Sequence, residues 1–252
     1  MVKKRGMVMV PFIILSSLLL FLVLYGPIPT VFIRKLSWNI IKRGKHPSGV
    51  SLTFDDGPHP LYTEQLLNIL KKFQVPATFF VVGELAARNP DLLKRMVNEG
   101  HHIGIHHNRH VSSWMLSPWQ LKKEIQTCSD TIQALTNHKP LYYRPPWGHF
   151  NLFSFLFIRP YKVILWSSIS KDWKQLKKER LASRLAGDAG DGTIYLLHDN
   201  GDTMGADSAA PGTMIETLME VIPILKQQGY QFISLDQLLV EKSNKQGLKR
   251  LI

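Results

Sequence analysis

The sequence predicts an α/β fold, a (β/α)7-type barrel with parallel strands, preceded by one N-terminal transmembrane helix. Residues Met7 to Tyr25 are almost wholly aliphatic or aromatic, and they supply the roughly 20 apolar residues that a spanning helix needs. After residue 48, short apolar runs alternate with amphipathic stretches. This alternation is typical of parallel strands joined by helices, and about seven such units are enough to curl a sheet into a barrel.

The N-terminal segment favours an uncleaved membrane anchor. No charged side chain occurs from Gly6 to Ile33, and Gly26, Pro27 and Pro29 are expected to stop the helix. A cleaved signal peptide is the alternative, because Lys3 to Arg5 form a basic start, but no small-x-small cleavage site follows the apolar run. The predicted anchor covers residues 1–29.

The charges on either side of the anchor leave its orientation open. Lys3 to Arg5 favour a cytoplasmic N-terminus. The segment after the anchor is also basic and favours the cytoplasmic side as well, through Arg34, Lys35, Lys42, Arg43 and Lys45. Long domains can cross a membrane despite flanking charge. We therefore expect a single-pass membrane protein whose catalytic domain lies outside the cytoplasm.

The rest of the chain divides into a basic linker over 30–48, a catalytic domain over 49–240 and a basic tail over 241–252. The expected strands are Gly49 to Phe54, Ala77 to Val82, His102 to Ile105, Leu141 to Tyr143, Tyr161 to Trp166, Thr193 to Leu197 and Gln231 to Ser234. The expected helices are Thr63 to Phe73, Asp91 to Glu99 after the Asn89-Pro90 start signal, a longer helix opened by Pro118, and Gly212 to Gln228.

The composition indicates one sizeable domain. The chain has 252 residues, 44% of them hydrophobic and 20% charged, with a net charge of +12. That charge suits work near anionic polymers or lipid headgroups, and no nucleic-acid-binding signature accompanies it. Cys128 stands alone, which excludes an internal disulfide and predicts a small buried hydrophobe. We expect a monomer.

Polar side chains follow most of the expected strands, where reactive groups gather in barrels of this kind. Asp55 and Asp56 follow the first strand, His106 and His110 the third, Arg144 the fourth, and Asp172 the fifth, while His198 ends the sixth. Two imidazoles at four-residue spacing and one carboxylate make a facial site that suits Zn²⁺ or another divalent transition ion. Taken singly, these residues also fit a solvated turn and a histidine-rich surface loop.

Five segments in order carry a family resemblance. They are Thr53-Phe54-Asp55-Asp56-Gly57-Pro58, His106 with His110, Arg144-Pro145-Pro146-Trp147-Gly148, Asp172-Trp173 and Leu197-His198-Asp199. Together they resemble the motifs of the polysaccharide deacetylase family, the NodB-homology or carbohydrate esterase family 4 type, over Ser48 to Val240. The resemblance implies a distorted (β/α) barrel and metal-dependent removal of acetyl groups from chitin-like polymers, peptidoglycan or xylan.

The resemblance also implies a role for each motif residue. Asp56, His106 and His110 would hold one divalent ion, zinc in the first place or else cobalt, nickel or iron. Asp55 would be the general base, oriented by Arg144, and His198 the general acid, partnered by Asp172. The backbone N–H of Trp147 would stabilise the oxyanion, and Pro146 and Trp173 would line the substrate site beside it.

The sequence departs from the family pattern at four positions. Ile105 and His107 stand where Asn and Ser or Thr flank the first metal histidine, so either His107 replaces the hydroxyl as a hydrogen-bond donor or the metal ligands are held less firmly. Trp147 replaces a frequent Tyr, and Ile169 replaces a frequent acidic residue, which predicts a thinner polar network behind the general acid.

The expected function is removal of N-acetyl groups from an amino-sugar polymer, cell-wall peptidoglycan or a chitin-like glycan. Two alternatives stay open. The anchor and the basic flank also suit deacylation of a lipid-linked sugar at the membrane. The departures at Ile105, His107 and Ile169 also suit a catalytically weak glycan-binding module.

Overall fold

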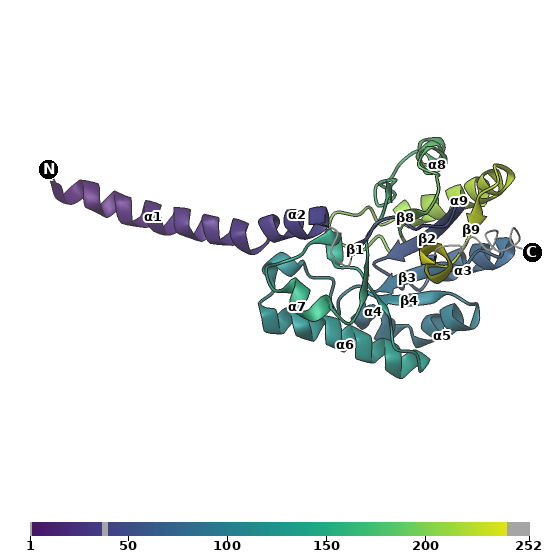
Figure 1. The fold of residues 1–252 in the computed structure, drawn as a ribbon, viewed down its shortest axis with the longest axis horizontal. Coiled ribbons are helices and arrows are strands. Elements are labelled where there is room, and N and C mark those ends of the chain that lie inside the picture. Colours follow the sequence, from purple (N-terminus) through teal and green to yellow (C-terminus); the bar gives the residue numbers. More distant parts are fainter. Residues whose placement is uncertain (1, 37–39, 241–252) are drawn as a thin grey trace, which may run out of the picture.

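The computed structural model describes residues 2–36 and 40–240 as one curled parallel sheet surrounded by helices, with a long N-terminal helix projecting from it (Figure 1). The strands are β1 (Ile40–Ile41), β2 (Gly49–Asp55), β3 (Ala77–Val81), β4 (His102–Ile105), β5 (Tyr142–Tyr143), β6 (Lys162–Ile164), β7 (Ser168–Ile169), β8 (Thr193–His198) and β9 (Gln231–Phe232). All seven expected strands are present. The predicted α/β barrel fold is thereby confirmed in a distorted form.

The sheet runs in the order β1-β6-β5-β4-β3-β2-β8-β7, with β9 beside β2, and every strand pair in it is parallel. The edge strands β1 and β7 do not pair with each other, so the curled sheet does not close into a complete barrel. A single antiparallel bridge from Arg43 to Thr193 joins the segment after β1 to the start of β8. Because the carboxyl ends of parallel strands share one edge, the loops after them meet at one rim.

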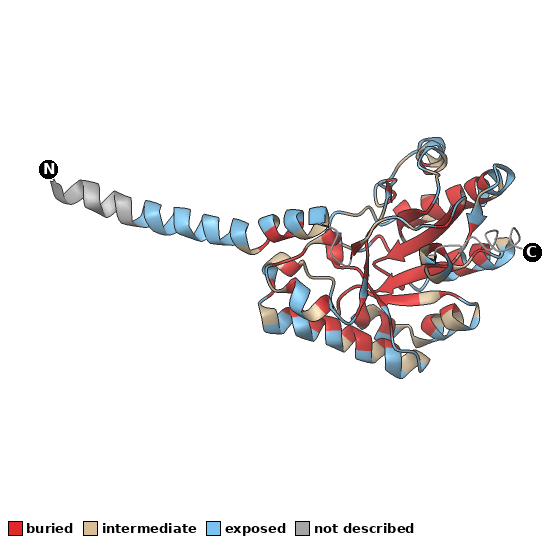
Figure 2. Cartoon of the chain, in the orientation of Figure 1, coloured by how far each residue is buried: buried red, intermediate tan, exposed pale blue. Residues whose placement is uncertain are grey.

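Central strands are buried on both faces, as is usual in parallel sheets. All seven residues of β2 are buried between β3 and β8 (Figure 2). Alternate residues face opposite sides of the sheet: Phe79 belongs to the large core under the outer helices, whereas Phe80 belongs to a smaller cluster with Leu235 and Leu238. Cys128 is buried in the large core, as expected.

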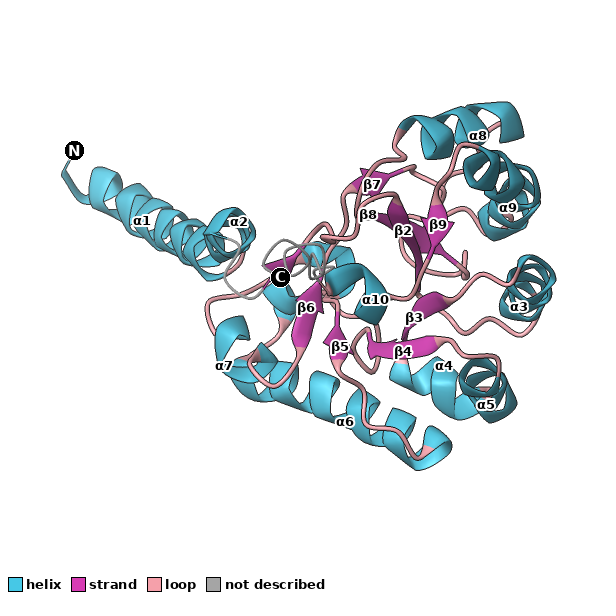
Figure 3. Ribbon diagram, turned by 45° about the vertical axis from the view of Figure 1, so that its right-hand side comes forward, coloured by secondary structure: helices cyan, strands magenta, loops and turns pink. Residues whose placement is uncertain are grey.

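Helices form the outer layer around the strands (Figure 3). They are α3 (Tyr62–Phe73), α4 (Gly83–Arg88), α5 (Pro90–Asn98), α6 (Pro118–Thr136), α7 (Ser154–Ile158), α8 (Lys178–Gly187) and α9 (Ala210–Gln227), with 3-10 turns η1 (Ser113–Met115) and η2 (Pro146–Gly148). The short helix α10 (Leu235–Leu239) instead packs on the inner side of the curled sheet, in the cluster that contains Phe80. Local signals fix their ends: α6 starts at a capping box of Ser117 and Gln120, and α3 ends at a left-handed Gln74.

The N-terminal helix α1 (Val2–Tyr25) is followed at once by a second helix, α2 (Pro27–Leu36). The stop at Gly26 is thus a bend between helices, because Pro27 occupies a first-turn position where the missing N–H costs no hydrogen bond. Residues 30–48, interpreted from the sequence as a linker, contain most of α2 and strand β1. The predicted tail, 241–252, lies outside the described residues.

Candidate active site

The carboxyl ends of β2, β4, β5 and β8 surround a cavity of about 290 Å³ at the rim of the sheet. Its walls include the expected side chains of Asp55, Asp56, His106, His110, Trp147, Trp173 and His198, together with Trp166, Ile169, Leu196, Thr203, Met204, Gly205 and Ala206. Arg144 and Asp172 lie directly behind this wall, each fully buried. The structure thus brings together residues from all five sequence motifs.

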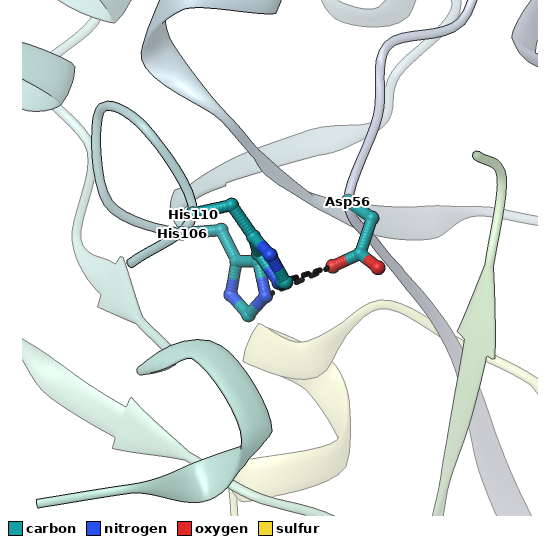
Figure 4. A group of neighbouring side chains, drawn as sticks. All are labelled: Asp56, His106 and His110. Atoms are coloured by element: carbon teal, nitrogen blue, oxygen red, sulfur yellow. Dashed lines mark ion pairs between the residues drawn. The ribbon is translucent and has the colours of Figure 1, made fainter. Parts of the chain in front are cut away.

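Asp56, His106 and His110 converge on one point (Figure 4). The Oδ1 atom of Asp56 lies 3.2 Å from Nε2 of His106 and 2.9 Å from Nε2 of His110, and the three candidate ligand atoms all lie within 4.8 Å of one another. The loop that carries the two histidines follows β4, and its backbone is left-handed at His107 and His110, with φ of 63° and 52°. This turn aims both imidazoles at Asp56.

The donor set fits a divalent transition ion. The Nδ1 atom of His106 lies 2.8 Å from the carbonyl oxygen of Arg144. A carbonyl can only accept, so Nδ1 carries a proton, and Nε2 faces Asp56, where it can bind a cation through its lone pair or donate a hydrogen bond to the carboxylate. Electron-pair donors that face one another need positive charge between them, either protons or a metal cation. Two nitrogens and one carboxylate oxygen match the ligand preference of zinc and its neighbours.

Further contacts hold Asp56 as an anion in one orientation. Thr203 donates its hydroxyl to Oδ2 at 2.7 Å, and the Asn200 amide donates to the Asp56 carbonyl at 3.1 Å. Burial alone would raise the pKa of the Asp56 carboxyl, but hydrogen bonds from His106 and His110 outweigh it and keep the pKa well below the usual range. One oxygen is therefore fixed by the protein, and the other faces the histidines.

Asp55 is held by a buried guanidinium. Nη1 of Arg144 lies 2.6 Å from Oδ1 of Asp55, and Nη1 also donates to the Thr53 hydroxyl at 2.9 Å. The remaining donors of Arg144 reach the carbonyls of Ile164, at 2.9 Å, and Leu165, at 3.1 Å. With Oδ1 occupied in this way, Oδ2 of Asp55 is the free oxygen, 3.9 Å from Nε2 of His106.

His198 is held as a cation by Asp172. Its Nδ1 lies 3.0 Å from Oδ1 of Asp172, and its backbone N–H donates to Oδ2 at 2.7 Å. Burial by itself would lower the pKa of His198, but the charge and hydrogen bond of Asp172, with smaller contributions from Asp56 and Asp55, raise it to about 9. A proton on Nε2 is then available to the cavity at neutral pH.

Aromatic side chains form the rest of the wall. Trp147 lies on η2 with a left-handed φ of 56° and stays 39% exposed, its ring centroid 4.4 Å from that of His110. Trp173 packs edge-on to His198 at 5.4 Å. Pro146, the first residue of η2, is buried. Exposed indole faces beside polar groups suit the apolar faces of sugar rings.

The structure also places the residues that depart from the family pattern. His107 is fully buried; its Nδ1 donates to the Val111 carbonyl at 2.8 Å, and its Nε2 accepts from the Tyr143 hydroxyl at 2.8 Å. Burial lowers the pKa of His107 to about 3, so the ring is neutral. His107 therefore donates a hydrogen bond that closes the loop carrying His106 and His110. Ile169 is exposed and lines the cavity.

The polar network behind Asp172 is thin, in line with the expectation from Ile169. Ser170 contacts Asp172 only at 3.4 Å, and Arg184 donates to the Ser170 carbonyl at 2.8 Å. Sequence reasoning missed Thr203, Tyr143 and Thr53 as partners of the site. Thr203 and Tyr143 have no spacing signal that could have indicated them, because each meets its partner only through the folding of the sheet.

Comparisons with known proteins agree with this geometry. Residues 42–154 match the family model described as polysaccharide deacetylase. A peptidoglycan-N-acetylglucosamine deacetylase of Bacillus cereus is 34% identical over 194 residues, which cover 75% of this chain and 87% of that protein. The peptidoglycan-N-acetylmuramic acid deacetylase PdaA of Bacillus subtilis is 36% identical over 199 residues, 77% and 72% of the two chains.

A solved structure extends the likeness to three dimensions. A peptidoglycan N-acetylglucosamine deacetylase crystallised with an N-oxidanyl-benzamide ligand superposes with a TM-score of 0.75 at 27% sequence identity. The match covers 82% of this chain and 96% of that one.

Proposed function

Because this chain belongs to the polysaccharide deacetylase family, we propose that it hydrolyses N-acetyl groups on the amino sugars of cell-wall peptidoglycan. The observation that carries the proposal is the convergence of Asp56, His106 and His110 beside Asp55. Relatives named for both N-acetylglucosamine and N-acetylmuramic acid support the substrate class. Residues 49–240 are the proposed deacetylase domain, acting as a monomer.

The proposed reaction needs a base, an acid and an oxyanion donor in fixed positions. When bound at Asp56, His106 and His110, a divalent ion supplies Lewis acidity that polarises the acetamide carbonyl and acidifies water. Zinc suits this donor set best, and cobalt, nickel or iron would also fit. Oδ2 of Asp55 accepts the proton of the attacking water, since Arg144 occupies Oδ1.

The other side chains act on the leaving group and the sugar. Nε2 of His198 donates its proton to the amine nitrogen as the carbon–nitrogen bond breaks, and Asp172 keeps the ring charged and oriented until then. The backbone N–H of Trp147 is the proposed hydrogen-bond donor to the oxyanion. Trp147, Pro146 and Trp173 are the proposed substrate contacts.

We further propose that α1 remains attached as a single membrane span, with the domain outside the cytoplasm. The helical stretch from Pro11 to Leu36 contains an 18-residue window with a mean hydropathy of 2.2, and 6% of that window is buried within the protein. The end of α1 is also part of the folded domain: the backbone N–H of Leu152 donates to the Tyr25 carbonyl at 2.9 Å, and the Asn151 amide donates to the Tyr25 hydroxyl at 3.2 Å. Removal of the segment would break these contacts.

Acetate release from acetylated glycan tests the proposal. The full chain, loaded with Zn²⁺, Co²⁺ or Ni²⁺, should release acetate from peptidoglycan fragments, and Asp55→Asn should abolish this while the chain keeps its fold and its bound metal. Asp202→Asn, an exposed carboxylate near the rim, is the matched control and should stay active. Glycan binding without acetate release under all three metals would instead support the non-catalytic alternative.

A further inference from the structure

An exposed apolar surface lies between α2 and α7, next to the end of α1. We call it the α2–α7 surface and define it by Ile28, Phe32 and Leu36 of α2 with Leu152 and Phe155 of the α7 segment. These five side chains are 47% to 62% exposed and line a groove of about 860 Å³. Large side chains gathered in this way on one face mark a binding surface.

We propose that the α2–α7 surface binds the lipid surface from which α1 emerges, so that the catalytic domain lies on the membrane in one fixed orientation. The inference rests on the proposed membrane span, and it adds a second, independent contact with lipid. An apolar helical face beside basic residues is the kind of element that settles at the boundary between headgroups and acyl chains.

The length of the anchor predicts that the α2–α7 surface begins at the surface of the bilayer. At about 1.5 Å per residue, the apolar run from Met7 to Tyr25 covers roughly the 30 Å of a hydrocarbon core. The bilayer surface therefore falls near Gly26. Helix α2 begins at Pro27, so its apolar side chains start where the acyl chains end.

The charges around the groove match an anionic lipid surface. Lys35 is exposed in the last turn of α2, and Arg159 lines the groove itself. No acidic residue is among the side chains that line the groove in the described part of the chain. Basic side chains at this depth reach phosphate headgroups while their stems stay beside the acyl chains.

The junction between α1 and the domain is held by several contacts, so the anchor cannot act as a loose tether. The Thr30 hydroxyl donates to the Phe150 carbonyl at 2.7 Å and accepts from the Phe150 N–H at 2.9 Å and from the Trp114 indole at 2.8 Å. Gly26 lies so close to Trp114 that a Cβ there would stand 2.7 Å from the ring. The direction of α1 thus fixes how the domain faces the bilayer (Figure 1).

The same junction reaches the active-site wall. The guanidinium of Arg34 lies 5.5 Å from the ring centroid of Trp166, and Trp166 lines the cavity. Arg34 also approaches Gly148 of η2, where a Cβ would stand 3.4 Å from Nη1. The helix that carries part of the proposed lipid contact therefore also packs against the wall of the cavity.

Depth-dependent fluorescence quenching tests the proposal on the full chain. Single cysteines at Leu18, Phe155 and Met219 would carry an environment-sensitive nitrobenzoxadiazole label, in vesicles of phosphatidylethanolamine and phosphatidylglycerol that contain nitroxide-labelled lipids. The native Cys128 needs no removal, because its thiol is fully buried and burial raises its pKa to about 12. Met219 is the control, a 43% exposed apolar residue on α9.

The expected result is strong quenching at Leu18 and Phe155 and none at Met219. Quenching at Leu18 with a Phe155 signal equal to that of Met219 would overturn the α2–α7 contact and leave the anchor intact. A water-exposed signal at Leu18 would overturn the anchor and this inference together, whatever the acetate assay shows.

A charge placed on the surface gives a second test. Phe155→Asp should reduce lipid quenching of a label at Leu152 several-fold, whereas Met219→Asp should leave it unchanged. Acetate release from a soluble chito-oligosaccharide should be the same in both variants, since Phe155 lies outside the cavity. Unchanged quenching at Leu152 in Phe155→Asp would contradict the proposal.

Discussion

The pair formed by His198 and Asp172 predicts how activity depends on pH. Asp172→Asn keeps the size of the side chain but removes the charge that holds the proton on His198. In the wild type the pKa of His198 is about 9, against an ordinary value of 6.5. Without the carboxylate, the pKa should return toward the ordinary value of 6.5, because burial lowers it and only the smaller contributions of Asp56 and Asp55 still raise it, so the proposed general acid loses most of its protonation at neutral pH.

The size of the effect follows from the two pKa values. At pH 8, a group with a pKa of 9 is about 90% protonated and one with a pKa of 6.5 about 3%. The variant should therefore lose about 30-fold in kcat at pH 8 through protonation alone. At pH 6 both forms are mostly protonated, and this loss should shrink to less than twofold. A raised pKa preserves activity toward alkaline pH, so the wild type should decline only above about pH 9.

The assay is acetate release at saturating glycan and metal from pH 5.5 to 9.5, with wild type and Asp172→Asn side by side. Asp188→Asn is the control, because Asp188 accepts from Ser168 outside the cavity. An equal loss at pH 6 and pH 8 would refute the reasoning, since it would mean that Asp172 orients His198 without setting its charge.

Three further predictions concern the support of the site. Arg144→Met should lower the free energy of unfolding, measured in urea, by about 3–5 kcal/mol, because it leaves Asp55 buried without its partner. The control Lys178→Met, which breaks an exposed pair with Glu220, should lower it by under about 1 kcal/mol. His107→Ala should weaken zinc affinity about 10-fold or more in chelator competition, since the loop loses its tie to Val111, whereas the exposed His138→Ala should not. Thr203→Val should weaken zinc affinity about tenfold by freeing Oδ2 of Asp56, and Thr203→Ser should restore it; equal affinity in both would contradict the assigned contact.

Much of the fold followed from the sequence because its central strands are strongly apolar. The expected strand from Gly49 to Phe54 corresponds to β2 with one residue added, and His102 to Ile105 matches β4 in full. The two-residue strands β1 and β7 were missed, because β1 falls within the segment interpreted as a basic linker and β7 follows closely on an expected strand; the equally short β5 and β9 lie in expected strands of three and four residues. The short α7 was likewise not among the expected helices, because five residues are too few to show a helical period.

The candidate active site was likewise predicted only in part from the sequence. The motif residues could be placed on one rim because each follows a strand, and the structure brings Asp55, Asp56 and the two histidines into contact. The partners outside the motifs could not be predicted: Thr203, for example, lies in a loop that is 147 residues from Asp56 in the sequence. The catalytic roles themselves stay predictions until the variants above are measured.

Four residues around the cavity adopt left-handed backbone conformations that side chains disfavour: Asp56 with φ of 75°, His107, His110 and Trp147. Each such residue costs on the order of 1–2 kcal/mol relative to glycine. Replacing Trp147, which is 39% exposed, by glycine would relax the backbone there with little loss of buried packing, but it would remove a proposed substrate contact. Selecting variants for thermal stability alone would therefore favour the loss of residues at the proposed active site, so such a selection has to measure catalytic turnover as well as stability.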